Sequence, residues 1–266
     1  MPAVEKMIEL LSNVLRPYTF KGKARLLHGL CPRSGEENAE VFGYRIKLDR
    51  SDYIQRSMYL GTFEPLESCL VKEYLKPGMT FVDVGANVGY YTLLAASLVG
   101  SEGLVIAFEP SPYAYGRLTE TIAKNRMPNV RTIRAGLGDR TCELQLFIST
   151  KPGNHTPTMV PDAGGAPLSV PVFTLDEYLK ENEIDRVDLM KIDVEGFEPN
   201  VIKGATDSLK RGKIRAILCE FNAHWLAANQ SSFASLYDLL TAAGFVARSG
   251  KPDTQCTLQN ILFTIA

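Results

Sequence analysis

Three apolar segments follow one another in the first half of the chain. Residues 80–84 (T-F-V-D-V) and 104–108 (L-V-I-A-F) have the length and the β-branched content of buried strands. Residues 90–99 lie between them and are mostly apolar, as in a helix that is buried on most of its surface. Glycine-containing turns at 85–89 and 100–103 separate the three segments. This order of strand, turn, helix and strand predicts one βαβ unit.

The alternation of apolar runs and helical patterns continues to the end of the chain. Helices are expected at 64–76, 112–125, 174–182 and 232–243. Further core strands are expected at 130–134, 187–193 and 214–222, and an antiparallel end to the sheet is expected from 244–248 and 260–265. Strands that alternate with helices predict an α/β fold, in which a mainly parallel sheet carries helices on both faces.

An insertion interrupts this pattern. Residues 143–148 and 169–175 have the pattern of two strands in an extra β-hairpin. The loop that joins them is rich in Pro and Gly and carries His155. A long loop inside a compact domain is either disordered or functional. We expect this loop to cover a substrate pocket, and an idle loop is the alternative.

An N-terminal extension, residues 1–57, precedes the main domain at 58–266. Apolar residues near its start share one helical face, and residues 41–48 alternate enough to suggest an accessory strand. We interpret the helix as packed on the flank of the domain. A lid or a homodimer contact is the other interpretation of the same pattern.

The composition limits the classes of protein to which this chain can belong. The chain has 266 residues and a formal net charge of −1. A dedicated nucleic-acid-binding protein usually has a basic excess, so this balance weighs against RNA or DNA as a partner. No apolar stretch approaches the roughly 20 residues that a membrane-spanning helix needs. The five cysteines lie far apart and form no C-x-x-C pair, which predicts free thiols in a reducing cytoplasm and no thiolate zinc site.

The glycine turn of the βαβ unit is typical of nucleoside binding. Glu109 follows the second strand, where a carboxylate can hold two vicinal ribose hydroxyls. A dinucleotide site usually reads G-x-G-x-x-G, but Asn87 and Tyr90 stand at its second and third glycines. Asp83 adds a negative charge just before the turn. These residues favour S-adenosyl-L-methionine, which is cationic and has no phosphate, over a dinucleotide; a turn without any ligand is the remaining alternative.

Three motifs in this order resemble the FkbM family of S-adenosylmethionine-dependent methyltransferases. They are F-V-D-V-G-A-N-V-G-Y-Y-T, V-I-A-F-E-P-S-P, and D-L-M-K-I-D-V-E-G-F-E at 188–198. The resemblance covers about residues 58–263 and implies a class I, Rossmann-like methyltransferase fold. It also implies O-methylation of a hydroxyl on a small molecule or sugar, without identifying the acceptor. In the family's pattern an acidic residue at Glu64 reaches the cofactor; otherwise Glu64 is a carboxylate that stabilises a helix N-terminus.

Ligands of open α/β sheets bind beyond the carboxyl ends of the strands. This rule brings together a set of residues far apart in sequence: Asp83, Glu109, Gly136, Asp193 and Asn222. We expect Glu109 to accept the ribose hydroxyls and Asp83 to hold the ammonium of the methionine part, directly or through water. The turn at 135–139 is expected to border the adenine through Leu137, although a plain turn fits equally.

The glycine turn is expected to contact the rest of the cofactor. Gly85 and Gly89 let the main chain approach the methionine and the ribose, because neither has a Cβ atom. Asn87 is expected to donate a side-chain hydrogen bond to the cofactor. Thr92, one turn into the helix, is expected to bind the methionine carboxylate or else its own helix.

Methyl transfer to an alcohol needs a base near the hydroxyl. The D-V-E-G segment supplies Asp193 and Glu195, and Lys191 would share their face if the strand continued. We rank Asp193 first and His155 second, with Glu195 as a further candidate and His224 as a surface residue. A helix cap or a Mg²⁺ or Ca²⁺ site is the alternative for the two carboxylates. No third ligand is evident, so no metal is predicted.

Three other functions fit parts of the sequence. A nicotinamide-dependent dehydrogenase fits the βαβ unit, but Asn87 and Tyr90 count against it. An RNA ribose methyltransferase fits a partial lysine–carboxylate set of Lys191, Asp193 and Glu220, but the near-neutral charge counts against it. A catalytically silent binding domain would have the same fold without the enzymatic activity.

Overall fold

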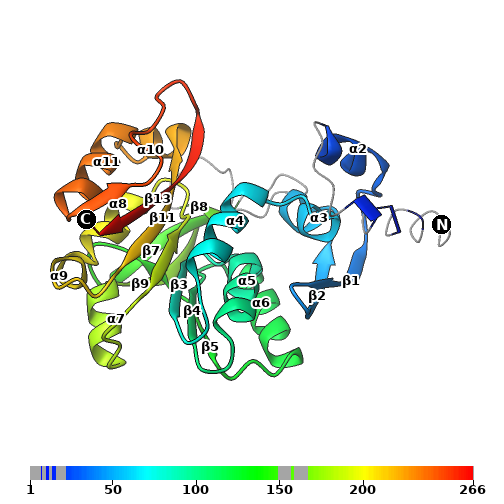
Figure 1. Ribbon diagram of the computed structural model, residues 1–266, viewed down its shortest axis with the longest axis horizontal. Helices are drawn as coiled ribbons and strands as arrows, with labels where there is room; N and C mark the ends of the chain where they lie inside the picture. Colours follow the sequence, from blue (N-terminus) through cyan, green and yellow to red (C-terminus); the bar gives the residue numbers. More distant parts are fainter. Residues whose placement is uncertain are drawn as a thin grey trace.

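A seven-stranded sheet lies at the centre of the computed structural model (Figure 1). The structure describes Met7, Leu10, Leu11, Val14 and Leu15, and then residues 22–148, 157–158 and 167–265. In the spatial order β12-β13-β11-β10-β3-β4-β5, only β13 runs antiparallel to its neighbours. The strands are β3 (Thr80–Val84), β4 (Leu104–Phe108), β5 (Val130–Ile133), β10 (Leu189–Ile192), β11 (Ala216–Asn222), β12 (Phe245–Ala247) and β13 (Leu258–Ile265).

The strand order places a crevice between β3 and β10. From β3 the chain proceeds to β4 and β5 on one side, whereas β10 and β11 lie on the other. Ligands of open α/β sheets bind where the order reverses in this way. The predicted parallel core, the antiparallel end and the βαβ unit are confirmed, and the architecture is the expected class I methyltransferase fold.

Helices cover both faces of the sheet because successive strand residues point to opposite sides. Phe81 faces a layer that consists of α4 (Pro65–Tyr74), α5 (Tyr90–Val99) and α6 (Pro112–Lys124). Val82 faces the other layer. That layer consists of α7 (Leu175–Glu181), α8 (Glu198–Lys203), α9 (Thr206–Lys210), α10 (Ala223–Ala228) and α11 (Phe233–Ala242).

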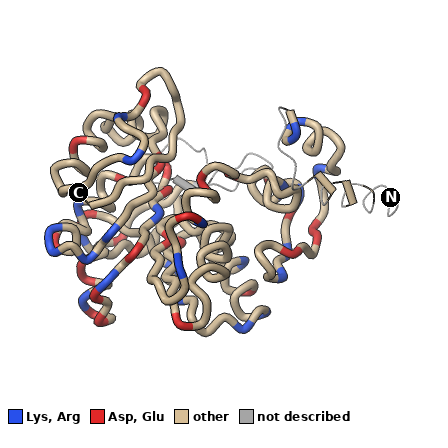
Figure 2. Tube along the Cα trace, in the orientation of Figure 1, with Lys and Arg blue, Asp and Glu red and all other residues tan. Residues whose placement is uncertain are grey.

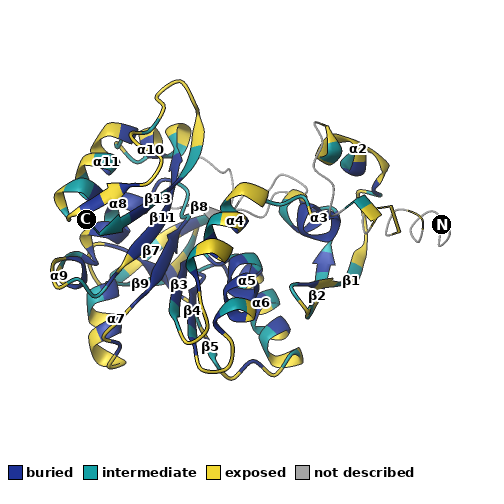
Figure 3. Cartoon of the chain, in the orientation of Figure 1, coloured by how far each residue is buried: buried dark blue, intermediate teal, exposed yellow. Residues whose placement is uncertain are grey.

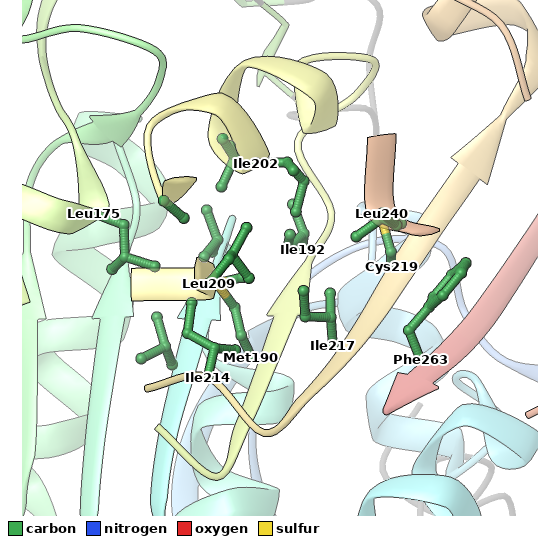
Figure 4. Close-up of a cluster of buried hydrophobic side chains, with 14 of the residues drawn as sticks. Leu175, Met190, Ile192, Ile202, Leu209, Ile214, Ile217, Cys219, Leu240 and Phe263 are labelled. Atoms are coloured by element: carbon green, nitrogen blue, oxygen red, sulfur yellow. The ribbon is translucent and has the colours of Figure 1, made fainter. Parts of the chain in front are cut away.

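The core therefore lies in two apolar layers, one on each side of the strands. Figure 4 shows part of the second layer, in which Met190 and Ile192 of β10 pack against Ile202 and Leu209. Figure 3 shows the same division in the whole molecule, with buried strands and helices that are exposed on their outer faces. No helix in the described ranges is long and apolar enough to cross a bilayer.

The N-terminal extension differs from the sequence prediction. The expected accessory strand at 41–48 is present from residue 44 onward, but it does not include the first residues, because the chain turns at Phe42 (φ 53°) and Gly43 (φ 85°). The turn joins β1 (Glu36–Val41) and β2 (Tyr44–Asp49) in an antiparallel hairpin, as left-handed two-residue turns do. Two unpredicted helices, α2 (Lys23–Leu30) and α3 (Tyr53–Leu60), accompany the hairpin. The predicted boundary at 57–58 falls within α3, whose buried residues share a core cluster with α5.

The inserted hairpin is confirmed and belongs to a second sheet, in the order β6-β9-β7-β8. Its strands are β6 (Gly136–Leu137), β7 (Cys142–Ile148), β8 (Pro157–Thr158) and β9 (Pro167–Phe173). The segment 135–139 is therefore more than a turn, since β6 pairs with β9. The prediction for His155 lies outside the described residues.

Candidate active site

A cavity opens at the carboxyl ends of β3, β4 and β10. The atom-free space of the cavity, its open mouth included, is about 910 Å³. The predicted residues that line it are Gly85, Asn87, Glu109, Gly136, Leu137, Asp193 and Glu195. Glu64, Asp83, Gly89 and Thr92 are not part of its lining.

Two backbone amides fix Glu109 in the wall of this cavity. The N–H groups of Asn87 and Ser111 each donate to one carboxylate oxygen, both at 2.8 Å. Asn87 reaches this position with a left-handed φ of 50°, which Asn tolerates better than most residues. Burial raises the pKa of Glu109 to about 7, although the two amide bonds lower it. Each oxygen keeps a further lone pair that can accept a ligand hydroxyl.

The Asn87 side chain is partly committed to the turn. Its carbonyl oxygen accepts the N–H of Val88 at 2.8 Å, so the amide NH₂ is the part that can donate to a ligand. This arrangement agrees with a donor role for Asn87.

Close packing requires glycine at two positions of the turn. A Cβ on Gly85 (φ 85°) would lie 1.9 Å from the backbone oxygen of Asp193, and one on Gly89 (φ 101°) would lie 2.7 Å from Leu118 Cδ1. The Asp193 N–H also donates to the Val84 carbonyl. The glycine turn and the D-V-E-G segment therefore touch directly, and residues of both line the cavity.

Asp83 and Thr92 form a buried pair beneath the turn. The Thr92 hydroxyl donates to the Asp83 carboxylate at 2.6 Å, and the two residues are 0% and 1% exposed, respectively. Burial raises the pKa of Asp83 to about 6, and the charge of Lys191 opposes this shift. The Thr92 hydroxyl thus donates to Asp83 and not to its own helix. The pair connects β3 to α5 and supports the turn from behind.

Lys191 is the cation at the centre of the site. Its amine donates to Asp193 at 2.7 Å and lies 4.5 Å from the centre of the Tyr91 ring, a cation–π contact. Burial alone would lower the pKa of Lys191, but the carboxylates of Asp193, Glu64 and Asp83 raise it, so the amine stays protonated. Glu64 accepts the Tyr91 hydroxyl and belongs to this network instead of lining the cavity.

The D-V-E-G segment is a tight turn and not a continued strand. Glu195 has a φ of 52° and Gly196 a φ of 91°, so the expected shared face of Lys191, Asp193 and Glu195 does not extend past Asp193. One oxygen of the buried Glu198 accepts the N–H groups of Val194 and Gly196, both at 3.1 Å. Glu198 thus holds the turn that presents Glu195 to the cavity.

Helix α10 packs against this turn. A Cβ on Gly196 would lie 2.3 Å from the Trp225 carbonyl oxygen, and the Asn229 side chain donates to the Gly196 carbonyl at 2.9 Å. Asn222, expected at the rim, caps α10 by accepting the Trp225 N–H. His224 is exposed and is not part of the cavity lining.

Two glutamates near the turn have strongly raised pKa values. Burial, followed by repulsion from Asp193, raises the pKa of Glu195 to about 8 and that of Glu220 to about 10. The Trp225 side chain interacts with the Glu195 carboxyl and opposes its shift. Glu198 and Trp225 were not predicted as site residues, and Glu220 was named only in the alternative of an RNA ribose methyltransferase. For Glu198 the available signal was its place as the third carboxylate of D-V-E-G-F-E.

The lining fits a cationic nucleoside better than a phosphate-containing one. Glu109, Asp193 and Glu195 supply carboxyl groups, and Leu137 and Phe197 supply apolar surface for a base. The one cation in the described lining is Lys191, which is paired with Asp193. Phosphates would find no free positive charge there. In the described part of the chain, no group of three or more His, Cys, Asp or Glu side chains could hold a metal ion.

Comparisons with known proteins identify a methyltransferase domain. The family model described as "Methyltransferase FkbM domain" matches residues 83–247. The hexuronic acid methyltransferase AglP of Haloferax volcanii is 28% identical over 188 residues, which cover 70% of this chain and 74% of that protein. The 2-O-methyltransferase NoeI of Sinorhizobium fredii is 26% identical and covers 65% and 75%, respectively. A crystal structure of methyltransferase FkbM from Methylobacillus flagellatus KT is 17% identical with a TM-score of 0.47, and covers 80% of this chain and 55% of that one.

Proposed function

This chain belongs to the FkbM family of S-adenosylmethionine-dependent methyltransferases, and we propose that it methylates a hydroxyl of a sugar or another small molecule. The observation that carries this proposal is the placement of Glu109, Asp193 and Glu195 around one cavity. Glu109 is placed to bind the ribose of a nucleoside, and Asp193 and Glu195 are placed to bind the hydroxyl of an acceptor. The relatives named as a hexuronic acid methyltransferase and a 2-O-methyltransferase support the same chemistry.

In this proposal the cavity wall holds the cofactor from three sides. Glu109 accepts the two ribose hydroxyls, and the Asn87 amide donates to the same part of the ligand. Leu137 and Phe197 flank the adenine, and the main chain of the glycine turn borders the methionine part. Glu64, Asp83 and Thr92 act one layer behind this wall, through Lys191 and the turn.

Bound S-adenosylmethionine supplies an electrophilic methyl group on a sulfonium. The protein must hold the acceptor oxygen in line with that group and remove its proton. Glu195 is the stronger base, because a pKa of about 8 gives its ionised form a higher proton affinity than an ordinary carboxylate has. Asp193 forms an ion pair with Lys191, which compensates its charge. We therefore assign Asp193 to orienting the hydroxyl of the acceptor. His155 remains an alternative base.

Three expectations about location, acceptor and oligomeric state complete the proposal. All five cysteines are free thiols, which suits the reducing cytoplasm. Lys and Arg are interspersed with Asp and Glu along the described chain (Figure 2), and such mixing supports a small-molecule acceptor over a nucleic acid. Leu10, Val14 and Leu26 are exposed apolar residues of the N-terminal extension that suit a homodimer contact.

The experiment is isotope transfer from labelled cofactor. The protein is incubated with a metabolite extract and S-adenosylmethionine that carries a labelled methyl group, and products are identified by mass spectrometry. We expect label on an oxygen of a small molecule. The Glu195→Gln variant should lower turnover by about 100-fold or more and leave the affinity for S-adenosylhomocysteine unchanged. Label on no small molecule, or full turnover by this variant, contradicts the proposal.

A further inference from the structure

A second pocket lies on the N-terminal extension, where α2 and α3 pack against each other (Figure 1). Its described lining is formed by six residues: Ala24, Arg25, His28, Arg33, Tyr53 and Arg56. Half of them are arginines, and none of the six is acidic. The pocket and the catalytic cavity have no described lining residue in common. It is therefore a separate, basic feature of the molecule.

The positive charges of this pocket are not balanced by carboxylates. Within the described ranges, Arg25, Arg33 and Arg56 form no ion pair. Arg25 and Arg33 are exposed, so water solvates their charges, whereas Arg56 is only 8% exposed. A buried cation without an acidic partner costs free energy, because its charge is desolvated and not neutralised. An anionic ligand would supply the negative charge that the pocket lacks.

Hydrogen bonds hold the Arg56 guanidinium in the wall of the pocket. Its Nη1 donates to the carbonyl groups of Arg50 and Ser51, at 2.6 and 3.3 Å, and its Nε donates to His28 Nδ1 at 3.3 Å. In the described part of the chain, Nη2 donates no hydrogen bond. A guanidinium presents its N–H groups in a planar fork that matches the oxygens of a phosphate. Nη2 is thus the donor that is left for a ligand.

His28 contributes a neutral ring to the pocket. Its Nδ1 accepts the Arg56 N–H, so the ring proton lies on Nε2, which is 3.3 Å from the hydroxyl oxygens of both Ser57 and Thr62. Burial, followed by the charges of Arg56 and Arg33, lowers the pKa of His28. The ring therefore orients Arg56 without adding a charge, and it reports on the charge beside it.

Helix α3 contributes to both the pocket and the catalytic cavity. Tyr53 and Arg56 are three residues apart and line the basic pocket, whereas Ile54 and Met58 are four residues apart and line the catalytic cavity. Residues three or four positions apart share one face of a helix, so α3 presents a different face to each. A ligand in the basic pocket would hold α2 against the face of α3 that lies opposite the catalytic cavity.

We propose that the pocket between α2 and α3 binds a phosphate group, either as the free ion or as part of a phosphorylated molecule. A phosphate near its second ionisation carries almost two negative charges, which balance three arginines better than the single charge of a carboxylate. The catalytic cavity offers no such site, because Lys191, the one cation of its described lining, is paired with Asp193. The inference is independent of the proposed function, since it concerns no residue assigned to methyl transfer.

The test is calorimetric titration of the full chain with inorganic phosphate and with acetate, at about pH 7.5, where phosphate is mostly the dianion. Sodium chloride keeps the ionic strength constant. We expect phosphate to bind at least about tenfold tighter than acetate, as additional charge-assisted hydrogen bonds allow. Imidazole signals in NMR spectra give a second readout, because the chain has three histidines. The His28 signals should shift as phosphate saturates the pocket, whereas those of His224 should not.

Three arginine variants localise the binding. Arg25→Gln and Arg33→Gln remove exposed charges that have no ion pair to lose, and each should weaken phosphate binding by about threefold or more. Arg56→Gln should weaken it most, and circular dichroism checks that this variant is folded. Arg248→Gln is the matched control, because Arg248 is exposed directly after β12 and lines neither cavity; it should bind phosphate as the wild type does.

Two further ligands distinguish the source of the phosphate. Binding of glucose 6-phosphate, without binding to vesicles of phosphatidylcholine and phosphatidic acid, supports a soluble phosphorylated ligand. Binding to these vesicles that is lost when Arg25 and Arg33 are both replaced by Gln supports a lipid headgroup. Phosphate that binds no tighter than acetate, phosphate binding that the double variant retains in full, or His28 signals that stay unchanged at saturation overturns the inference.

Discussion

Two backbone amides hold Glu109 in the wall of the cavity, next to the glycine turn. Its pKa of about 7 means that the free protein changes its acceptor capacity near neutral pH. An ionised carboxylate accepts both ribose hydroxyls, and a protonated one loses an acceptor site to its own proton. The proposed contact between Glu109 and the ribose should therefore depend on pH.

We predict that affinity for S-adenosylhomocysteine falls by about five- to tenfold from about pH 8 to about pH 6, as Glu109 gains a proton. Calorimetric titration at several pH values measures this change. Glu109→Gln should bind more weakly and lose most of the pH dependence, whereas Glu195→Gln serves as a control that retains it. A wild-type affinity that does not vary across this range contradicts the ribose assignment.

Gly85 shows how a single residue fixes the site. We predict that Gly85→Ala lowers the free energy of unfolding by about 2–4 kcal/mol, because the new Cβ meets the Asp193 carbonyl in addition to the strain of a positive φ. Gly78→Ala is the matched control, with a similar φ of 82° and no atom within 4 Å of the added Cβ; it should cost about 1 kcal/mol. Urea denaturation compares the two, and equal losses would argue against the close contact.

At the scale of elements, local pattern predicted most of the sheet and failed at the extension. The strands β3, β4 and β10 are mostly apolar, with Asp83 and Lys191 as the charged exceptions, so they can be recognised without knowledge of distant contacts. Helix α3 was missed because its buried residues include Gln55, Arg56 and Ser57, so it shows no apolar stripe. The β1–β2 hairpin was missed because its turn is formed by Phe42 and Gly43, within an apparently continuous alternation.

The candidate site shows the same division between local and distant information. The rim rule brought Glu109 and Asp193 together from strand ends alone, and both line one cavity. Trp225 was not predicted as a site residue, and Glu220 was named only in an alternative, because their positions depend on pairing with β13 and on the contact between Gly196 and α10. Such contacts join residues about 30–40 positions apart and leave no periodic trace in the sequence.

The D-V-E-G turn depends on Glu198. We predict that Glu198→Ala leaves the N–H groups of Val194 and Gly196 without their acceptor and destabilises the protein by about 2–3 kcal/mol. Hydrogen exchange of residues 194–196 should accelerate more than exchange in α5, and turnover should fall because Glu195 loses its position. Unchanged exchange in this turn would show that other contacts hold it.

At the scale of the whole molecule, buried carboxyls make stability depend on pH. Glu195 and Glu220 have folded-state pKa values of about 8 and about 10, against 4.5 as the ordinary value. Below the ordinary pKa both states are protonated, and above it the unfolded chain ionises first. The stability that these groups contribute is therefore complete at acidic pH and is lost as pH rises through their folded pKa values.

We predict that the melting temperature of the free protein falls by several degrees between about pH 6 and about pH 8.5. Glu220→Gln should melt at a higher temperature than wild type at the alkaline end and should show a flatter profile. Thermal denaturation by calorimetry measures both. A melting temperature that rises across this range would contradict the burial of these carboxyls as ionisable, unpaired groups.

The most direct test of the account is calorimetric binding of S-adenosylhomocysteine to the wild-type chain and to Glu109→Ala. The account predicts binding to a single site in the wild type and a loss of affinity of at least about tenfold in the variant, since charge-assisted bonds to the ribose disappear. Absence of binding in the folded wild type, or equal affinity in the two proteins, would contradict the cavity beside Gly85 and Glu109 as the cofactor site.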